Sequence, residues 1–206
     1  MPRSPLSAKA YAEVRARILK AARQIFETKG IDALSMRALA SRVGLSAAAL
    51  YRYFPGKGDV LAALWQEGVR ALEARLDQIS SAEPDAMRAL AALAHTYADF
   101  ARGDPDLYRL LFSINVETDD RMRDSDDTDF RTYRIVRERM AQAVAEGRVA
   151  PADPDLATQI LWSAIHGALS LHLTCINFPL CDPGDLIGRA VDTVLRGLTA
   201  DKGVVS

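Results

Sequence analysis

Cysteine and histidine are scarce in this chain of 206 residues, which holds two of the former and three of the latter. Cys175 and Cys181 form neither a CxxC pair nor the spacing of a zinc site or a disulfide framework. No histidine follows a glutamate in Glu-x-x-His spacing, and the chain lacks a glycine-rich phosphate loop and a G-x-S-x-G elbow. We therefore expect no enzyme activity, cofactor or metal. A helical-bundle enzyme with a metal or haem site is kept as an alternative.

A large net charge is also missing, because 26 Lys and Arg are balanced by 27 Asp and Glu. The balance hides a separation along the chain. Residues 1–58 hold 11 Lys and Arg against 3 Asp and Glu, a net charge of +8, and residues 59–206 carry the remaining −9. A basic first segment joined to an acidic remainder indicates a polyanionic partner for the first segment alone.

Long hydrophobic runs are absent except at 156–178, where 23 positions carry no Asp, Glu, Lys or Arg. Eight of these positions are polar and the flanks are acidic, whereas a membrane-spanning helix favours fewer polar groups and basic flanks. We interpret the run as a helix buried on most sides. The first ten residues contain no apolar core of a signal peptide. We expect a cytoplasmic protein that does not enter a membrane.

Apolar residues recur at helical spacing almost throughout, with glycine and proline between the periodic segments, which predicts an all-α fold. The expected helices span 8–29, 36–43, 47–53, 57–80, 85–102, 105–115, 130–147, 154–178 and 183–199. Seven acidic residues within 116–129 predict a loop there. We expect two domains, a three-helix head at 1–56 and a larger helical bundle at 57–206.

Residues 36–53 have the pattern of a helix-turn-helix. Gly44 can adopt the left-handed conformation of a tight turn, and Ser35 and Ser46 are typical N-cap residues. The second helix is too short to be stable alone, and in such a motif it enters the major groove of DNA. Tyr53 fits the core equally well, and any single basic residue fits a solvated face. The expected DNA-contacting residues are Ser35, Arg37, Ser46, Ala47, Ala48, Tyr51, Arg52, Tyr53 and Lys57, with Lys9, Arg15, Arg17 and Arg42 widening the positive surface.

The segment from Ile25 to Leu61 resembles the DNA-binding domain of the TetR family of transcriptional repressors. The resemblance is carried by Lys29-Gly30, Ser35, Leu39-Ala40, Val43-Gly44-Leu45-Ser46, Leu50-Tyr51, Tyr53-Phe54, Lys57 and Leu61. Many members carry a glycine followed by a threonine or serine where this chain has Ala48-Ala49. This difference bears on which bases the helix prefers. The run from Trp162 to Gly167 is similar to the Trp…His-Gly element of one C-terminal subgroup. The resemblance implies an all-helical homodimer with one operator half-site per subunit and a regulatory pocket in the larger domain.

Aromatic residues supply the candidate effector site in the larger domain. They are Tyr97, Phe100, Tyr108, Phe112, Tyr133, Trp162 and His166. Trp162 and His166 are one turn apart, so both can face one cavity, although aromatic residues at helical spacing are more often core residues. His166 by itself is more typical of a hydrogen-bonded core histidine. Because polar groups are few, we expect a largely apolar small-molecule effector.

The last two expected helices, at 154–178 and 183–199, suit a homodimer interface. The first carries a stripe of small residues, namely Ser163, Gly167, Ser170 and Thr174. The second carries a broad apolar face made by Leu186, Ile187, Ala190, Val191, Val194, Leu195 and Leu198, a pattern that an intramolecular core would also show. The preferred interpretation is a repressor that an effector releases from a pseudo-palindromic double-stranded DNA operator. An effector-independent architectural DNA-binding protein is a further alternative.

Overall fold

The computed structural model describes residues 7–103, 105, 108, 131–150, 152–175 and 177–199. Within these ranges the regular elements are helices, and Val149 pairs with Thr199 in an isolated antiparallel bridge. The all-α prediction is confirmed. No helix in the described part of the chain is both long and apolar enough to span a membrane. The predicted loop at 116–129 lies outside the described residues, as does most of the helix expected at 105–115.

The chain divides into two compact units. Unit 1 comprises residues 1–68 and 106–115, and unit 2 comprises residues 69–105 and 116–206. The division falls inside helix α4 (Lys57–Ala82), whereas the expected domain boundary lies directly before this helix.

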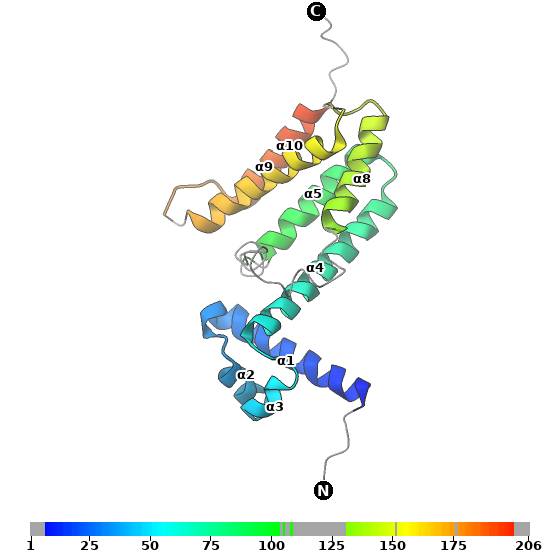
Figure 1. The fold of residues 1–206 in the computed structure, drawn as a ribbon. Coiled ribbons are helices and arrows are strands. Elements are labelled where there is room, and N and C mark those ends of the chain that lie inside the picture. Colours follow the sequence, from blue (N-terminus) through cyan, green and yellow to red (C-terminus); the bar gives the residue numbers. More distant parts are fainter. Residues whose placement is uncertain are drawn as a thin grey trace, which may run out of the picture. The chain divides into compact units, whose positions relative to one another are not determined.

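Unit 1 contains α1 (Ala8–Lys29), the 3-10 turn η1 (Ile31–Ala33), α2 (Met36–Val43), α3 (Ala47–Tyr51) and the first part of α4 (Figure 1). A serine precedes each of the first three α-helices and accepts a hydrogen bond from a backbone N–H three residues further on. The three serines are Ser7, Ser35 and Ser46. Since the first N–H groups of a helix have no partner inside it, these bonds fix where each helix begins.

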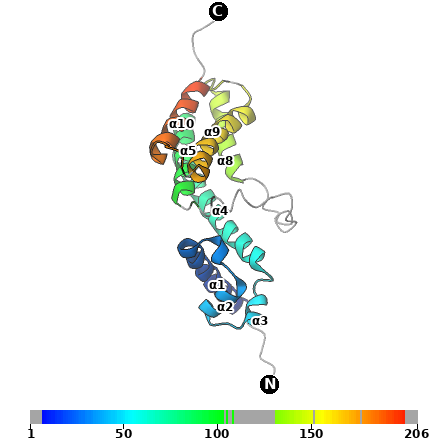
Figure 2. The same cartoon turned by 90° about the vertical axis from the view of Figure 1, so that its left-hand side faces the viewer.

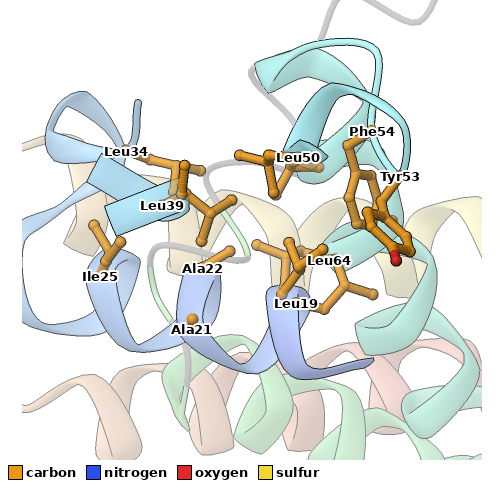
Figure 3. Close-up of a cluster of buried hydrophobic side chains, with 14 residues drawn as sticks. Leu19, Ala21, Ala22, Ile25, Leu34, Leu39, Leu50, Tyr53, Phe54 and Leu64 are labelled. Carbon is orange, nitrogen blue, oxygen red and sulfur yellow. The ribbon is translucent and has the colours of Figure 1, made fainter. Parts of the chain in front are cut away.

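The apolar core of unit 1 joins its helices through a few fully buried side chains. Leu39 of α2, Leu50 of α3 and Ile18 of α1 are all completely buried. Figure 3 shows Leu39 and Leu50 in one cluster with Ala22, whose small side chain allows the short helices to approach α1 closely. Removing any of the three large side chains is expected to leave a cavity.

Unit 2 contains the second part of α4, α5 (Ala86–Gly103), α8 (Arg131–Ala145), α9 (Pro154–Thr174) and α10 (Pro183–Leu198). Helices α5, α8, α9 and α10 lie side by side in both views (Figures 1 and 2), and α9 packs against α10, α8 and α5. Leu72 and Leu76 of α4, Leu93 of α5 and Ile135 of α8 form a shared buried cluster. Unit 2 is therefore a helical bundle with its own core.

Ion pairs connect neighbouring elements of unit 2. Arg137 of α8 donates from Nε and Nη2 to the two carboxylate oxygens of Asp155 on α9, at 2.6 and 2.8 Å. Arg148 donates from Nη1 to Asp85, directly before α5, at 2.7 Å. The hydrogen bond from Arg148 lowers the pKa of Asp85 from 3.8 to about 2. These contacts fix the position of α8 against its neighbours.

Helix α9 differs from the sequence prediction in length and in burial. It ends at Thr174, not at 178, and Phe178 is 66% exposed. The prediction that the charge-free run is buried on most sides is wrong for the single chain, because Leu156, Ile160, Trp162 and Leu171 are all exposed. Pro179 accounts for part of the shortening, since a residue before proline avoids helical geometry.

Candidate functional site

The turn between α2 and α3 has the geometry that the sequence predicts. Gly44 ends α2 with φ 70° and ψ 30°, which is the left-handed region. The N–H of Leu45 donates to the carbonyl of Ala40, five residues earlier, at 2.9 Å, and this bond is typical of a Schellman motif. Ser46 then begins α3 by accepting from Ala49 at 3.1 Å. The turn brings the two short helices together without a longer loop.

Helix α3 buries one side and exposes the other. Leu50 is fully buried, whereas Ala47, Ala48 and Arg52 are exposed and Tyr51 is 50% exposed. Ser35 and Arg37, at the start of α2, are exposed too. The exposed surface therefore combines small side chains and N–H groups at one end of α3 with a phenol and a guanidinium at the other. Such a surface can contact base edges and phosphates in a major groove.

Two of the expected DNA contacts are engaged inside unit 1. The Tyr53 side chain is buried, and its ring stacks on that of Tyr11 with centroids 4.9 Å apart. This places the Tyr53 ring in the core, which is the alternative that the sequence left open. Lys57 Nζ donates to the carbonyl of Ile31 at 2.8 Å. Contacts of these two residues with phosphate stay predictions.

Sequence reasoning missed the roles of Tyr11 and Arg15. Arg15 Nη1 donates to the carbonyl of Tyr53 at 2.6 Å, and its guanidinium carbon lies 4.1 Å from the centre of the Phe54 ring. The Tyr11 hydroxyl donates to the carbonyl of Arg52 at 3.3 Å. Both residues lie one turn apart on α1 and contact the segment that follows α3. The sequence shows that the two residues are one helical turn apart. It does not reveal their partners, which are about forty positions away.

Three of the candidate effector residues meet in unit 2. The hydroxyl of Tyr97 on α5 lies 2.6 Å from Nε2 of His166 on α9, so the two groups share a hydrogen bond. The Trp162 ring meets the His166 ring edge-on, with centroids 4.6 Å apart. Burial lowers the pKa of His166 from 6.5 to about 4, so the imidazole is neutral at pH 7. The prediction that Trp162 and His166 share one face is consistent with this geometry.

The structure shows contacts or burial for three of the other four candidate effector residues. Phe100, like Tyr97, packs against the buried cluster around Leu76. The hydroxyl of Tyr133 donates to Asp155 at 3.0 Å, in the first turn of α9 and two turns before Trp162. Tyr108 belongs to unit 1, where burial raises its pKa to about 12. Phe112 lies outside the described residues. Effector contacts by all seven candidate residues stay predictions.

The capped helix-turn-helix, its exposed second helix and the separate helical bundle define a DNA-binding regulator. A family model described as "Bacterial regulatory proteins, tetR family" matches residues 18–64. A second model, "Tetracyclin repressor-like, C-terminal domain", matches residues 90–198, which is more than half of the chain. The chain belongs to the TetR family of transcriptional regulators, and the resemblance seen in the sequence is confirmed.

Curated proteins and solved structures extend this relationship over most of the chain. The nucleoid occlusion factor SlmA of Vibrio campbellii is 32% identical over 165 residues, which are 76% of this chain and 82% of that protein. A TetR/AcrR regulator from Thermobifida fusca has a TM-score of 0.70 at 24% identity, over 90% of this chain and 98% of its own. A regulator from Saccharomonospora viridis, solved in complex with choline, has a TM-score of 0.77 at 19% identity, over 92% and 100%. The two structures show a shared fold.

Proposed function

We propose that this DNA-binding regulator is an effector-responsive repressor that acts as a homodimer. The observation that carries the proposal is the exposed face of α3, held at its start by Ser46 and packed on its other side through Leu50. In a dimer, two such helices read half-sites about 34–36 Å apart on one face of the duplex. An effector shifts the dimer towards the state that it binds more tightly through unit 2. If the two α3 helices are spaced differently in that state, DNA binding weakens by the effector's difference in affinity for the two states.

The base-reading part of the proposal rests on the exposed side chains of α3. Ala47 and Ala48 suit contact with a thymine methyl group, and Arg52 suits a guanine edge or a phosphate. Arg52→Ala is expected to weaken binding to a duplex selected from a random pool by about 1–3 kcal/mol. Arg196→Ala removes another exposed arginine, on α10, and serves as the control. Equal affinity of the two variants would reject the assignment to Arg52.

The homodimer part rests on the exposed face of α9. Leu156, Ile160 and Leu171 are 46%, 38% and 49% exposed in the single chain, and Ser163, Gly167 and Ser170 are exposed on the same helix. Large apolar side chains gathered on one helix indicate a surface that a partner covers. On α10, by contrast, Ile187, Val191, Leu195 and Leu198 are buried within their own chain. Sedimentation equilibrium at micromolar concentration tests the proposal, and a mass of a single chain would contradict it.

The effector part rests on the cluster of Tyr97, Trp162 and His166. A neutral imidazole, a phenol and a partly exposed indole suit a small molecule that is largely apolar with few polar groups. A library of such compounds is screened for release of the protein from the selected duplex. Hits are expected to lose their effect on His166→Phe and to keep it on His95→Phe, which changes a histidine of α5 that lies near Asp192. Hits that act equally on both variants would place the effector elsewhere.

A second candidate function follows from the relatives named as nucleoid occlusion factors. In this alternative the chain occupies many chromosomal sites and no effector releases it. Chromosome-wide mapping of bound sites separates the two functions. A few sites next to promoters, with expression changes on deletion, support the repressor. Many dispersed sites without expression changes support the architectural role.

A further inference from the structure

Carbonyl groups at and after the C-terminal end of α3 need hydrogen-bond donors from outside this helix. A helix of five residues leaves most of its carbonyl groups without a partner inside the helix. Its first turn is capped by Ser46, but the residues after it, Arg52 and Tyr53, direct their carbonyl groups out of the helix. Both carbonyls accept hydrogen bonds from α1, from Tyr11 and Arg15 respectively. A positive group at a helix C-terminus is favourable because of the helix dipole.

The two donors are themselves held by aromatic rings. The guanidinium of Arg15 lies over Phe54, which is buried, and the ring of Tyr11 stacks on Tyr53 at an interplanar angle of 27°. Arg15 is partly buried, in contrast to Arg17, which is exposed on the same helix. A guanidinium placed over a ring and bonded to a carbonyl at 2.6 Å is fixed in one orientation.

We propose that Tyr11 and Arg15 form a clamp that positions α3 for reading DNA, and that the charge of Arg15 is not used on a phosphate. The inference rests on the DNA-binding function described above. Ser46 fixes one end of α3 and the clamp fixes the other, with Tyr51 and Arg52 next to the clamped end. Readout of bases requires side chains held within about 0.5 Å of their productive position. A clamp therefore contributes to specific binding and adds little to non-specific attraction.

The salt dependence of binding distinguishes a clamp from a phosphate contact. Removing a phosphate contact lowers the slope of log affinity against log salt by about one and weakens binding to all duplexes alike. Removing the clamp leaves the slope unchanged and weakens binding chiefly to the preferred sequence. The probes are a duplex selected from a random-sequence pool by the unsubstituted protein and a scrambled duplex of equal length.

For Arg15→Gln in the full-length protein, we expect about a tenfold loss on the selected duplex, a smaller loss on the scrambled one and an unchanged salt slope. Arg17→Gln removes the same charge from the exposed side of α1 and shows the loss due to charge alone. If Arg15→Gln lowers the slope by about one and weakens both duplexes equally, Arg15 is a phosphate contact and the clamp is refuted. If it behaves like Arg17→Gln on the selected duplex, the clamp is refuted as well.

Tyr11→Phe covers the case in which Arg15→Gln unfolds unit 1. It removes one hydroxyl and keeps the ring that stacks on Tyr53. We expect a loss of about threefold on the selected duplex, with no change on the scrambled one and an unchanged melting temperature. Unchanged affinity for the selected duplex would overturn the clamp. If the unsubstituted protein selects no duplex from the random-sequence pool in dilute buffer, the DNA-binding function itself fails, and that outcome is distinct from either refutation.

Discussion

Lowering the pH from 7 to 5 is expected to destabilise the protein through His166. Folding buries its imidazole beside Tyr97 and Trp162, and this burial lowers the pKa from 6.5 to about 4. The unfolded chain binds a proton at this histidine below about pH 6.5, whereas the folded chain does not until about pH 4. The stability contributed by His166 is therefore complete above pH 6.5 and is lost as the pH falls towards 4.

The magnitude follows from linkage. One pKa unit corresponds to about 1.4 kcal/mol, and over this interval the full shift would remove about 2 kcal/mol. His166 is only partly buried and Trp162 beside it is 46% exposed, so water reaches the site and weakens the effect. After this reduction we expect a loss of about 1 kcal/mol between pH 7 and pH 5.

The assay is urea unfolding of the wild-type chain and of His166→Gln at pH 7 and pH 5, at one protein concentration. Glutamine retains a hydrogen-bonding group opposite Tyr97 but does not titrate. All other titratable groups are present in both proteins, so the difference between the two pH responses isolates His166. We expect the wild type to lose about 1 kcal/mol more than the variant. Equal losses would refute the buried, neutral state of this histidine.

Three further outcomes are expected. Gly44→Ala should lower the free energy of unfolding of the chain by about 1–2 kcal/mol because of its left-handed backbone, with Gly44→Asn closer to wild type; equal stability of both variants would contradict this origin. Gly167→Leu should leave the fold intact, since nothing lies within 4 Å of an added Cβ, yet shift sedimentation of the proposed dimer towards monomer, unlike Gly167→Ala. Above pH 3.8, Asp85→Asn should be less stable than the wild type, because Arg148 lowers the pKa of this carboxyl group. The difference should disappear as the pH falls towards 2 and the wild type loses this stability. Acid-unfolding curves that coincide would refute that last contribution.

Much of unit 1 could be predicted because its signals are local. The predicted range 36–43 of the first short helix equals the observed bounds of α2. Ser35 and Gly44 mark its two ends through bonds to residues at most four positions away. Such contacts depend on the identity and spacing of neighbours in the sequence, which is why a single chain reveals them.

Helix α9 was predicted less well because its signal is an average over many positions. A run without charged residues reports low polarity along its length, but not which side of the helix is covered or where the chain leaves the bundle. Leu171 and Phe178 are apolar and yet 49% and 66% exposed. A sequence pattern cannot separate burial inside the chain from burial against a second chain, since both require the same apolar side chains.

The charge of residues 1–58 shows a further limit of prediction from the sequence. Its net charge of +8 correctly indicates a polyanion-binding head, but it overstates how many cations are available for phosphates. Arg15 and Lys57 bond to backbone carbonyls, and Arg42 bonds to Gln24 at 3.1 Å. If such bonds persist in the complex, the salt slope counts fewer phosphate contacts than the net charge implies. The net charge read from the sequence therefore sets an upper limit on the number of phosphate contacts. Only the folded structure shows which cations are already bonded within the head.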